Sequence, residues 1–132
     1  MGRYLEKARE LRAITERHYN CAQAVLVPFA PRLGLDEETA FRIGANFGGG
    51  MRVASVCGAI TGGLMVLGLA GFDQPSDATS FIQKMKDRHD GMMMCADLLR
   101  VNEAKGGVKK VHCDGVVFEA VSILEEILNE EN

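Results

Sequence analysis

The sequence predicts an all-α fold: a compact, single-domain bundle spanning residues 1–132, with about six or seven helices around a central apolar, glycine-rich helix. Three observations support this prediction. Apolar residues recur at helical spacing along most of the chain. No segment shows the sustained alternation of apolar and polar residues that is typical of a strand. A chain of 132 residues also has the usual size of one domain with its own core.

The first half of the chain begins with three expected helices. Residues 3–17 place apolar side chains on one face and charges on the other, which predicts an amphipathic surface helix. Asn20 is a good cap for a second helix, which reaches Phe29. Asp36 is expected to cap a third helix, and this helix should end at the glycine triplet 48–50 because glycine is costly inside a helix.

An apolar run from residue 56 to residue 72 predicts the central helix. Ser55 is expected to cap it, which places Cys57 in its first turn. Gly58 and Gly62 are spaced four apart, so they lie on one face, where another backbone can approach closely. The run is near the lower length limit of a membrane span, which is the alternative interpretation; its glycines favour a buried helix.

The second half is expected to form three helices. Ser76 or Asp77 caps the first of them, and Asp90-Gly91 ends it. A regular apolar stripe predicts the last helix. The expected helical ranges are 77–89, 92–101 and 114–129. Acidic residues near the end of the chain are expected to form a solvated face, namely Glu125, Glu126, Glu130 and Glu131.

Charge and composition exclude some classes of partner. A net charge of -3 gives no broad basic footprint, so we expect no nucleic-acid partner. Residues 1–17 are rich in charge, which argues against a secretory signal peptide. We therefore expect a cytoplasmic protein without stable membrane insertion. In a reducing compartment, cysteines more often bind metals or take part in catalysis than form structural disulfides.

The chain has four cysteines, and none of them lies in a Cys-x-x-Cys pair. Their wide spacing is unlike that of a zinc finger or a thioredoxin motif. They could simply be small buried apolar residues, because free cysteine is often buried. Each cysteine is nevertheless expected at or near a helix N-terminus, where the dipole stabilises a thiolate. The four are Cys21, Cys57, Cys95 and Cys113.

Five segments of the chain resemble one family in the same order. They are Tyr19-Asn20-Cys21-Ala22-Gln23-Ala24-Val25, Phe47-Gly48-Gly49-Gly50-Met51, Val56-Cys57-Gly58-Ala59-Ile60-Thr61-Gly62, Cys95-Ala96-Asp97-Leu98-Leu99 and His112-Cys113. Together they are similar to the C_GCAxxG_C_C family of redox-active proteins, which has four cysteines and a CGAxxG element. The resemblance covers nearly the whole chain. It implies redox or metal chemistry.

A domain of similar type is joined to a split-Soret cytochrome, where an iron–sulfur site is associated with it. The resemblance therefore implies an iron–sulfur cluster, with zinc or another metal as the alternative. The metal ligands would be Cys21, Cys57, Cys95 and Cys113. Backbone amides near the cofactor would come from Gly49, Gly50 and Gly58. The haem part does not carry over, because the chain has no Cys-x-x-Cys-His motif.

Three hypotheses follow for function. The first is electron transfer through a bound cluster or metal, with a redox partner protein that the sequence does not identify. The second is thiol–disulfide chemistry, as an enzyme or a sensor, with Cys57 as the catalytic nucleophile and another cysteine resolving it. The third is a non-enzymatic helical interaction module, such as a homodimer or an accessory to a membrane transporter.

Overall fold

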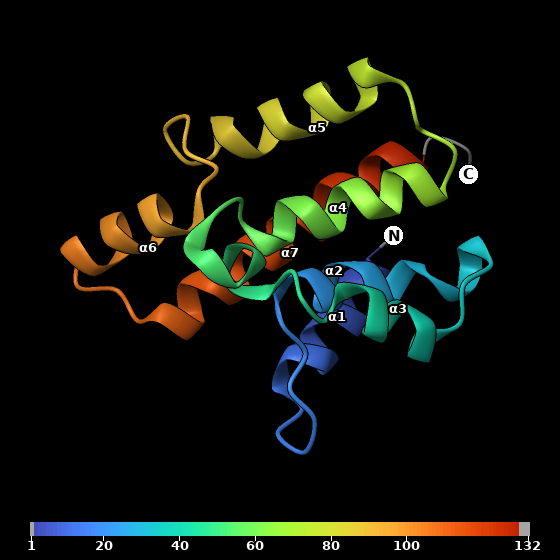
Figure 1. Cartoon of the computed structure of the whole chain (residues 1–132), viewed down its shortest axis with the longest axis horizontal. Coiled ribbons are helices and arrows are strands. Elements are labelled where there is room, and N and C mark those ends of the chain that lie inside the picture. The colour runs from blue at the N-terminus through green and yellow to red at the C-terminus, as the bar shows by residue number, and fades with distance from the viewer. Residues whose placement is uncertain (1, 130–132) are drawn as a thin grey trace.

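The computed structural model of the protein describes residues 2–129, and within this range it contains seven α-helices (Figure 1). The described residues form no strand, and only one isolated bridge joins Val56 to Met94. The predicted all-α fold is therefore confirmed. The helices are α1 (Arg3–Ala13), α2 (Cys21–Phe29), α3 (Glu37–Gly44), α4 (Gly58–Leu69), α5 (Pro75–Asp87), α6 (Cys95–Ala104) and α7 (Lys109–Asn129). A short 3-10 helix, η1 (Pro31–Leu33), and a wide turn, η2 (Gly50–Ala54), complete the elements.

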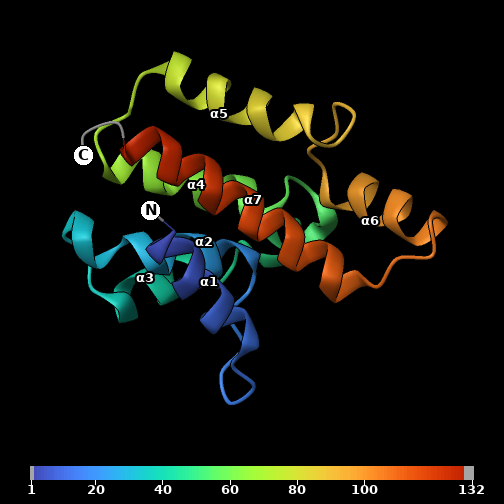
Figure 2. The same ribbon diagram turned by 180° about the vertical axis from the view of Figure 1, so that it is seen from behind.

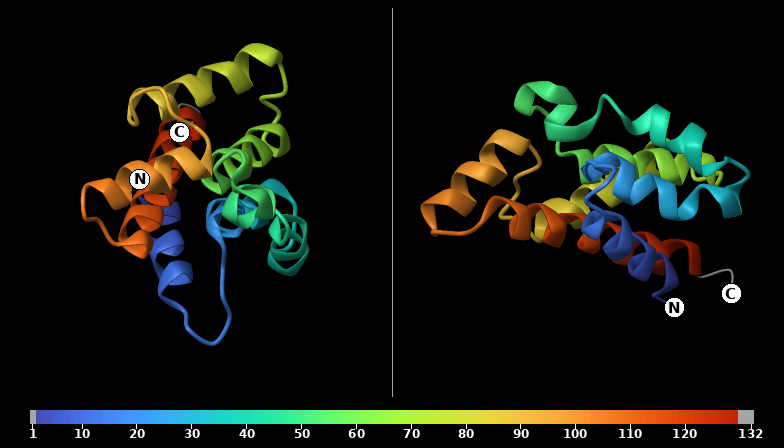
Figure 3. Two further views of the ribbon diagram at one scale, coloured as in Figure 1. Left: turned by 60° about the vertical axis from the view of Figure 1, so that its left-hand side comes forward. Right: turned by 90° about the horizontal axis from the view of Figure 1, so that it is seen from below.

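The centre of the molecule is the contact between α2 and α4. α2 also packs against α1, α3 and α7, whereas α4 packs against α5 and α7. Figure 2 shows α7 lying across α4 on the side opposite to that of Figure 1. α6 extends beyond this core at the end where α7 begins, as the two views of Figure 3 also show. The N-termini of α2, α4 and α6 consequently come close to the first turns of α7.

The buried side chains form one hydrophobic cluster that draws on all seven α-helices of the described residues. Phe29, Leu26, Ile60, Phe81 and Met85 are among its largest fully buried members. Every residue of α2 after Cys21 is buried, so α2 is as central as the predicted glycine-rich helix α4. No helix in residues 2–129 is long and apolar enough to cross a membrane. That the entire chain forms one domain stays a prediction.

Small residues let α2 and α4 approach closely, as the spacing of Gly58 and Gly62 predicts. A Cβ atom placed on Gly62 would lie 2.7 Å from the carbonyl oxygen of Ala22. One placed on Gly58 would lie 3.0 Å from the carbonyl oxygen of Phe47 and 3.1 Å from the Ala22 amide nitrogen. Any side chain at these two positions would therefore separate the helices.

Two predicted caps are present as hydrogen bonds. The side chain of Asn20 accepts from the Gln23 amide at 2.8 Å, and the Gln23 side chain accepts from the Asn20 amide at 2.8 Å. The Asp36 carboxylate accepts from the Thr39 amide at 2.9 Å. These side chains satisfy amides that the first turn of each helix would otherwise leave unpaired.

Other predicted boundaries are wrong. Ser55 does not cap α4; the N-cap is Cys57, because Ser55 closes the turn η2 by donating its amide to the Gly50 carbonyl. α5 begins after Gln74, whose amide donates to the Asp77 carboxylate. Asp77 is therefore the third residue of α5, and its side chain bonds the backbone of the N-cap residue Gln74. Pro75 occupies the first helical position, which proline fits well.

The first and last helices also differ in length from the prediction. α1 ends at Ala13, because Ile14 adopts an extended conformation. α7 begins at Lys109 rather than near Asp114, since no helix breaker lies between these residues. The third predicted helix ends at Gly44, before the glycine triplet, and the chain then enters η2.

The sequence predicted that Glu125 belongs to a solvated face, and this prediction is wrong. Its side chain is buried, and Oε2 accepts from the amides of Tyr4 and Leu5, each at 3.0 Å. A carboxylate in this position satisfies two amides at the start of α1 and complements the helix dipole. Glu126 is exposed, whereas Glu130 and Glu131 lie outside the described residues.

Replacing Gly62 by alanine should destabilise the fold. We expect G62A to lower the free energy of unfolding by about 1–3 kcal/mol, because the new methyl group would press on the backbone of α2. Gly68 is the matched control: it lies in the same helix, and a Cβ there meets nothing within 4 Å. G68A should be neutral or stabilising by up to about 1 kcal/mol. Urea denaturation of both variants tests this, and equal effects would contradict the proposed close contact.

Candidate functional site

The four cysteines line one cavity of about 510 Å³ at the end of the bundle where α6 meets α7. Each sulfur comes from a different segment: Cys21 from α2, Cys57 from the N-cap of α4, Cys95 from α6 and Cys113 from α7. Cys57 is buried and the other three are partly exposed. All four are free thiols. The fold thus brings together residues that no short sequence motif connects.

Cys21 owes its place to the capping residue before it. Asn20 begins α2, so Cys21 is the first residue of the helix. The Asn20 side-chain amide also donates to the carbonyls of Gly44 and Ala45, both at 3.2 Å. These bonds tie the start of α2 to the end of α3, which fixes the position of the Cys21 side chain.

Cys57 and Cys95 are held by two backbone hydrogen bonds between their segments. The Cys57 amide donates to the Met93 carbonyl at 2.9 Å, and the Cys95 amide donates to the Ser55 carbonyl at 2.6 Å. These bonds flank the antiparallel bridge between Val56 and Met94. The N-termini of α4 and α6 therefore face the cavity side by side.

Cys113 lies in the second turn of α7, not at the start of the last helix as predicted, because α7 begins at Lys109. Its side chain and that of Cys21 line the same cavity and interact there. The interaction with Cys21 is the largest cause that lowers the pKa of Cys113, and the positive charges of Arg12 and Lys109 act in the same direction. The same interaction, together with burial, raises the pKa of Cys21. Loss of one proton from the two side chains therefore leaves a thiolate beside a thiol, and the pKa directions favour the thiolate at Cys113.

Burial raises the pKa of Cys57 to about 11, although the backbone amides of Ala59 and Ile60 act in the opposite direction. Desolvation therefore outweighs the effect of the helix N-terminus at this cysteine. The pKa of Cys95 is also raised, again by burial first. Cys57 as the nucleophile stays a prediction, and these pKa directions favour Cys113 for that role.

The predicted cofactor-binding glycines lie in and beside the cavity. Gly49 and Gly58 line it. Gly50 packs against Cys95: a Cβ there would lie 2.9 Å from the Cys95 Cβ. Gly49 and Gly50 have positive φ angles of 62° and 65°, which favour glycine. Their part in holding a cofactor stays a prediction.

Within residues 2–129, no three histidine, cysteine, aspartate or glutamate side chains stand together as ligands of one metal ion. A single zinc ion would need such a set, since structural zinc sites hold four ligands around one centre. An iron–sulfur cluster distributes its cysteines over several iron atoms. The donor chemistry that fits a cluster, four thiols around one cavity, is present.

Arg12 is a residue of the site that no sequence pattern indicated. Its side chain is only 8% exposed, and Nε donates to Asp114 Oδ1 at 2.7 Å. One of its terminal nitrogens, Nη1, donates to the Tyr19 carbonyl at 2.9 Å. Arg12 looked like an ordinary charge on an amphipathic helix, and no local pattern distinguished it. The sequence did show that an acidic residue, Asp114, follows Cys113, and this was the one hint that a basic side chain such as Arg12 would lie beside the cysteine.

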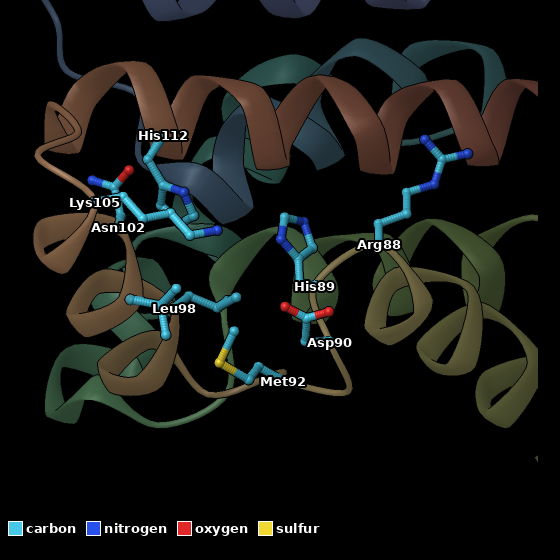
Figure 4. Close-up of a pocket in the computed structure, with 9 residues that line it drawn as sticks. Arg88, His89, Asp90, Met92, Leu98, Asn102, Lys105 and His112 are labelled. Atoms are coloured by element: carbon cyan, nitrogen blue, oxygen red, sulfur yellow. The ribbon is translucent and has the colours of Figure 1, made fainter.

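A second, smaller cavity of about 130 Å³ adjoins the first through His112, which lines both (Figure 4). The rings of His112 and His89 are 6.2 Å apart, and Figure 4 shows both beneath α7. His89 Nε2 lies 2.6 Å from Glu119 Oε1. Burial lowers the pKa of His112, and His89 adds to this effect. His112 is therefore a largely neutral neighbour of the cysteine cavity.

A comparison with known families matches the part of the chain that carries the four cysteines. Residues 19–127 match the family described as "Putative redox-active protein (C_GCAxxG_C_C)". The chain belongs to this family. The predicted resemblance is therefore confirmed, and so is the coarser functional expectation of a redox-active cysteine protein. No curated protein and no solved structure matches the chain.

Removing the Cys21 thiol should return Cys113 toward ordinary acidity. We expect C21A to raise the pKa of Cys113, because the interaction that contributes most to lowering it is lost. Thiolate absorbance in the ultraviolet, followed against pH, measures this change. C95A is the control: the Cys95 and Cys113 thiolates repel each other, so removing Cys95 should not raise the pKa of Cys113. An unchanged titration in C21A would contradict the assigned interaction between Cys21 and Cys113.

Proposed function

We propose that the protein carries out thiol–disulfide exchange, with Cys113 as the nucleophile and Cys21 as the resolving cysteine. The observation that carries this proposal is that Cys21 and Cys113 line one cavity, where the interaction with Cys21 lowers the pKa of Cys113. A thiolate is the attacking species in such exchange, and a neighbouring thiol can complete it. The family description, a redox-active protein, supports the same class of chemistry.

The reaction has two steps. The Cys113 thiolate attacks one sulfur of a substrate disulfide, whose S–S bond breaks; a mixed disulfide forms and the other half leaves as a thiolate. The Cys21 thiol then releases its proton, and its sulfur attacks Cys113. A Cys21–Cys113 disulfide forms and the second half of the substrate leaves. The dithiol has lost two electrons, the substrate has gained them, and an external thiol reductant restores the pair.

The pKa directions favour Cys113 over Cys57, because interaction with Cys21 lowers the pKa of Cys113 whereas burial raises the pKa of Cys57 to about 11. Cys113 therefore holds the larger thiolate fraction at neutral pH, and the thiolate is the attacking species.

Oxidation should join Cys21 to Cys113. We expect one equivalent of a thiol oxidant such as diamide to produce this disulfide first, because the acidic thiolate reacts fastest and its nearest partner resolves it. Peptide mapping by mass spectrometry identifies the bond. C113S should lose it, whereas the control variant C95S should keep it. A first disulfide between other cysteines would contradict the proposal.

The common cavity also favours a second candidate, the binding of an iron–sulfur cluster. All four cysteines line it, which is the donor set that such clusters take. The residues that would hold the cluster are Cys21, Cys57, Cys95 and Cys113, with the amides of Gly49, Gly50 and Gly58 near its sulfurs. A bound cluster would supply one-electron transfer to a partner protein.

Anaerobic reconstitution separates the two candidates. A cluster protein incubated with iron, sulfide and reductant should gain visible absorbance and bind iron in fixed proportion, and C95S should lose both. The disulfide chemistry of Cys21 and Cys113 does not need Cys95. Absence of absorbance and of stoichiometric iron would remove the cluster candidate and leave the exchange reaction.

The proposal places the protein in the cytoplasm, where low-molecular-weight thiols keep cysteines reduced and would regenerate the dithiol. The hypothesis of an interaction module, as a homodimer or a transporter accessory, stays a prediction.

A further inference from the structure

The cysteine cavity is lined by positive side chains and, within residues 2–129, by no carboxylate. Arg12, Arg52 and Lys109 contribute charge, and His18 and His112 contribute imidazoles. The chain as a whole has a net charge of -3, so this positive lining is a local feature. A cleft lined by one sign of charge raises the local concentration of ligands of the opposite sign.

The three cations are not equivalent. The charge of Arg12 is offset by Asp114, whose carboxylate lies 2.7 Å from Arg12 Nε. In the part of the chain that the structure describes, neither Arg52 nor Lys109 belongs to a salt bridge. Arg52 and Lys109 are therefore the charges available to a ligand.

Both available cations line the cysteine cavity. Lys109 acts electrostatically on Cys113 and on Cys95. Arg52 is held in position by hydrogen bonds from Nε to Asn46 Oδ1 at 3.1 Å and from Nη2 to the Ala45 carbonyl at 2.9 Å. A side chain that is already positioned loses less conformational entropy when a ligand binds.

Apolar side chains line the rest of the cavity. Leu98, Leu99, Val53 and Val116 are among them. The volume of about 510 Å³ is in the range of small-molecule sites. The lining therefore suits a compact ligand with an apolar body and a negatively charged group.

We infer that the substrates are small disulfides that carry negative charge, such as carboxylates, on an apolar body. This inference rests on the proposed thiol–disulfide exchange. The Cys113 thiolate would attack such a disulfide and release one half as an anionic thiolate, and Cys21 would then release the other half. The substrate gains two electrons and the dithiol becomes a disulfide.

Three reagents of different charge test the inference on the full-length reduced protein. They are 5,5′-dithiobis(2-nitrobenzoate), which is anionic, 2,2′-dithiodipyridine, which is neutral, and cystamine, which is cationic. Second-order rate constants are measured at pH 8.5, and mass spectrometry identifies the first cysteine modified. Each variant is compared with the wild type for the same reagent, which removes differences in leaving-group reactivity.

We expect the effect of each substitution to depend on the charge of the reagent. K109Q and R52Q should each slow the anionic reagent by about three- to tenfold relative to the neutral one, and should speed the cationic reagent. Raising the salt concentration from 0.01 M to 1 M should reduce the anionic preference of the wild type, because ions screen exposed charges. K84Q is the matched control, because Lys84 lies on α5, none of whose residues line the cavity.

Two results would overturn the inference in distinguishable ways. If Cys113 reacts first but K109Q and R52Q change all three rates equally, or no more than K84Q does, the exchange chemistry stands and the anionic preference is wrong. If Cys113 is not the first cysteine modified by any reagent, the proposed function fails and the inference fails with it. Circular dichroism of each variant confirms that the fold is intact.

Discussion

The close contact between α2 and α4 is the constraint on which the cysteine cavity depends. Gly58 and Gly62 carry no side chain that would hold the backbone of α4 away from Ala22. The first turns of the two helices therefore meet, and Cys21 and Cys57 reach the same cavity. Each glycine inside a helix lowers the stability of the fold by about 0.5–1 kcal/mol relative to alanine, and the close packing of α2 on α4 offsets this loss.

The remaining two cysteines are brought in by different forces. Backbone hydrogen bonds fix the segment of Cys95 against that of Cys57. Cys113 is positioned by the packing of α7 on α1, α2 and α4. The ion pair between Asp114 and Arg12 stabilises the contact between α7 and α1. The site thus combines steric, hydrogen-bonded and ionic contacts, and each of them positions a different thiol.

Those parts of the fold and site that depend on residues close together in the chain could be predicted from the sequence. The caps at Asn20 and Asp36 depend on neighbouring residues only, and the small-residue face of α4 depends on helical spacing. The buried role of Glu125 depends on α1, more than a hundred residues away, so no local pattern could reveal it.

The acidity of the cysteines shows the same limit. Sequence placed the thiols at helix N-termini, where the dipole favours a thiolate. Burial reverses that effect at Cys57, whereas Cys113, which lies a turn inside its helix, gains its acidity from Cys21 and from nearby cations. Burial and long-range partners are properties of the folded chain, and they decide which thiols become more acidic and which less.

The dependence of Cys113 on Cys21 makes the reactive thiolate a reporter of native structure. The two residues lie on helices at opposite ends of the chain and meet only when α7 docks on α2. A nascent or locally unfolded molecule would hold thiols of ordinary acidity, since neither Cys21 nor the neighbouring cations would lie beside Cys113. The fraction of Cys113 present as thiolate therefore measures how many molecules have α7 docked on α2.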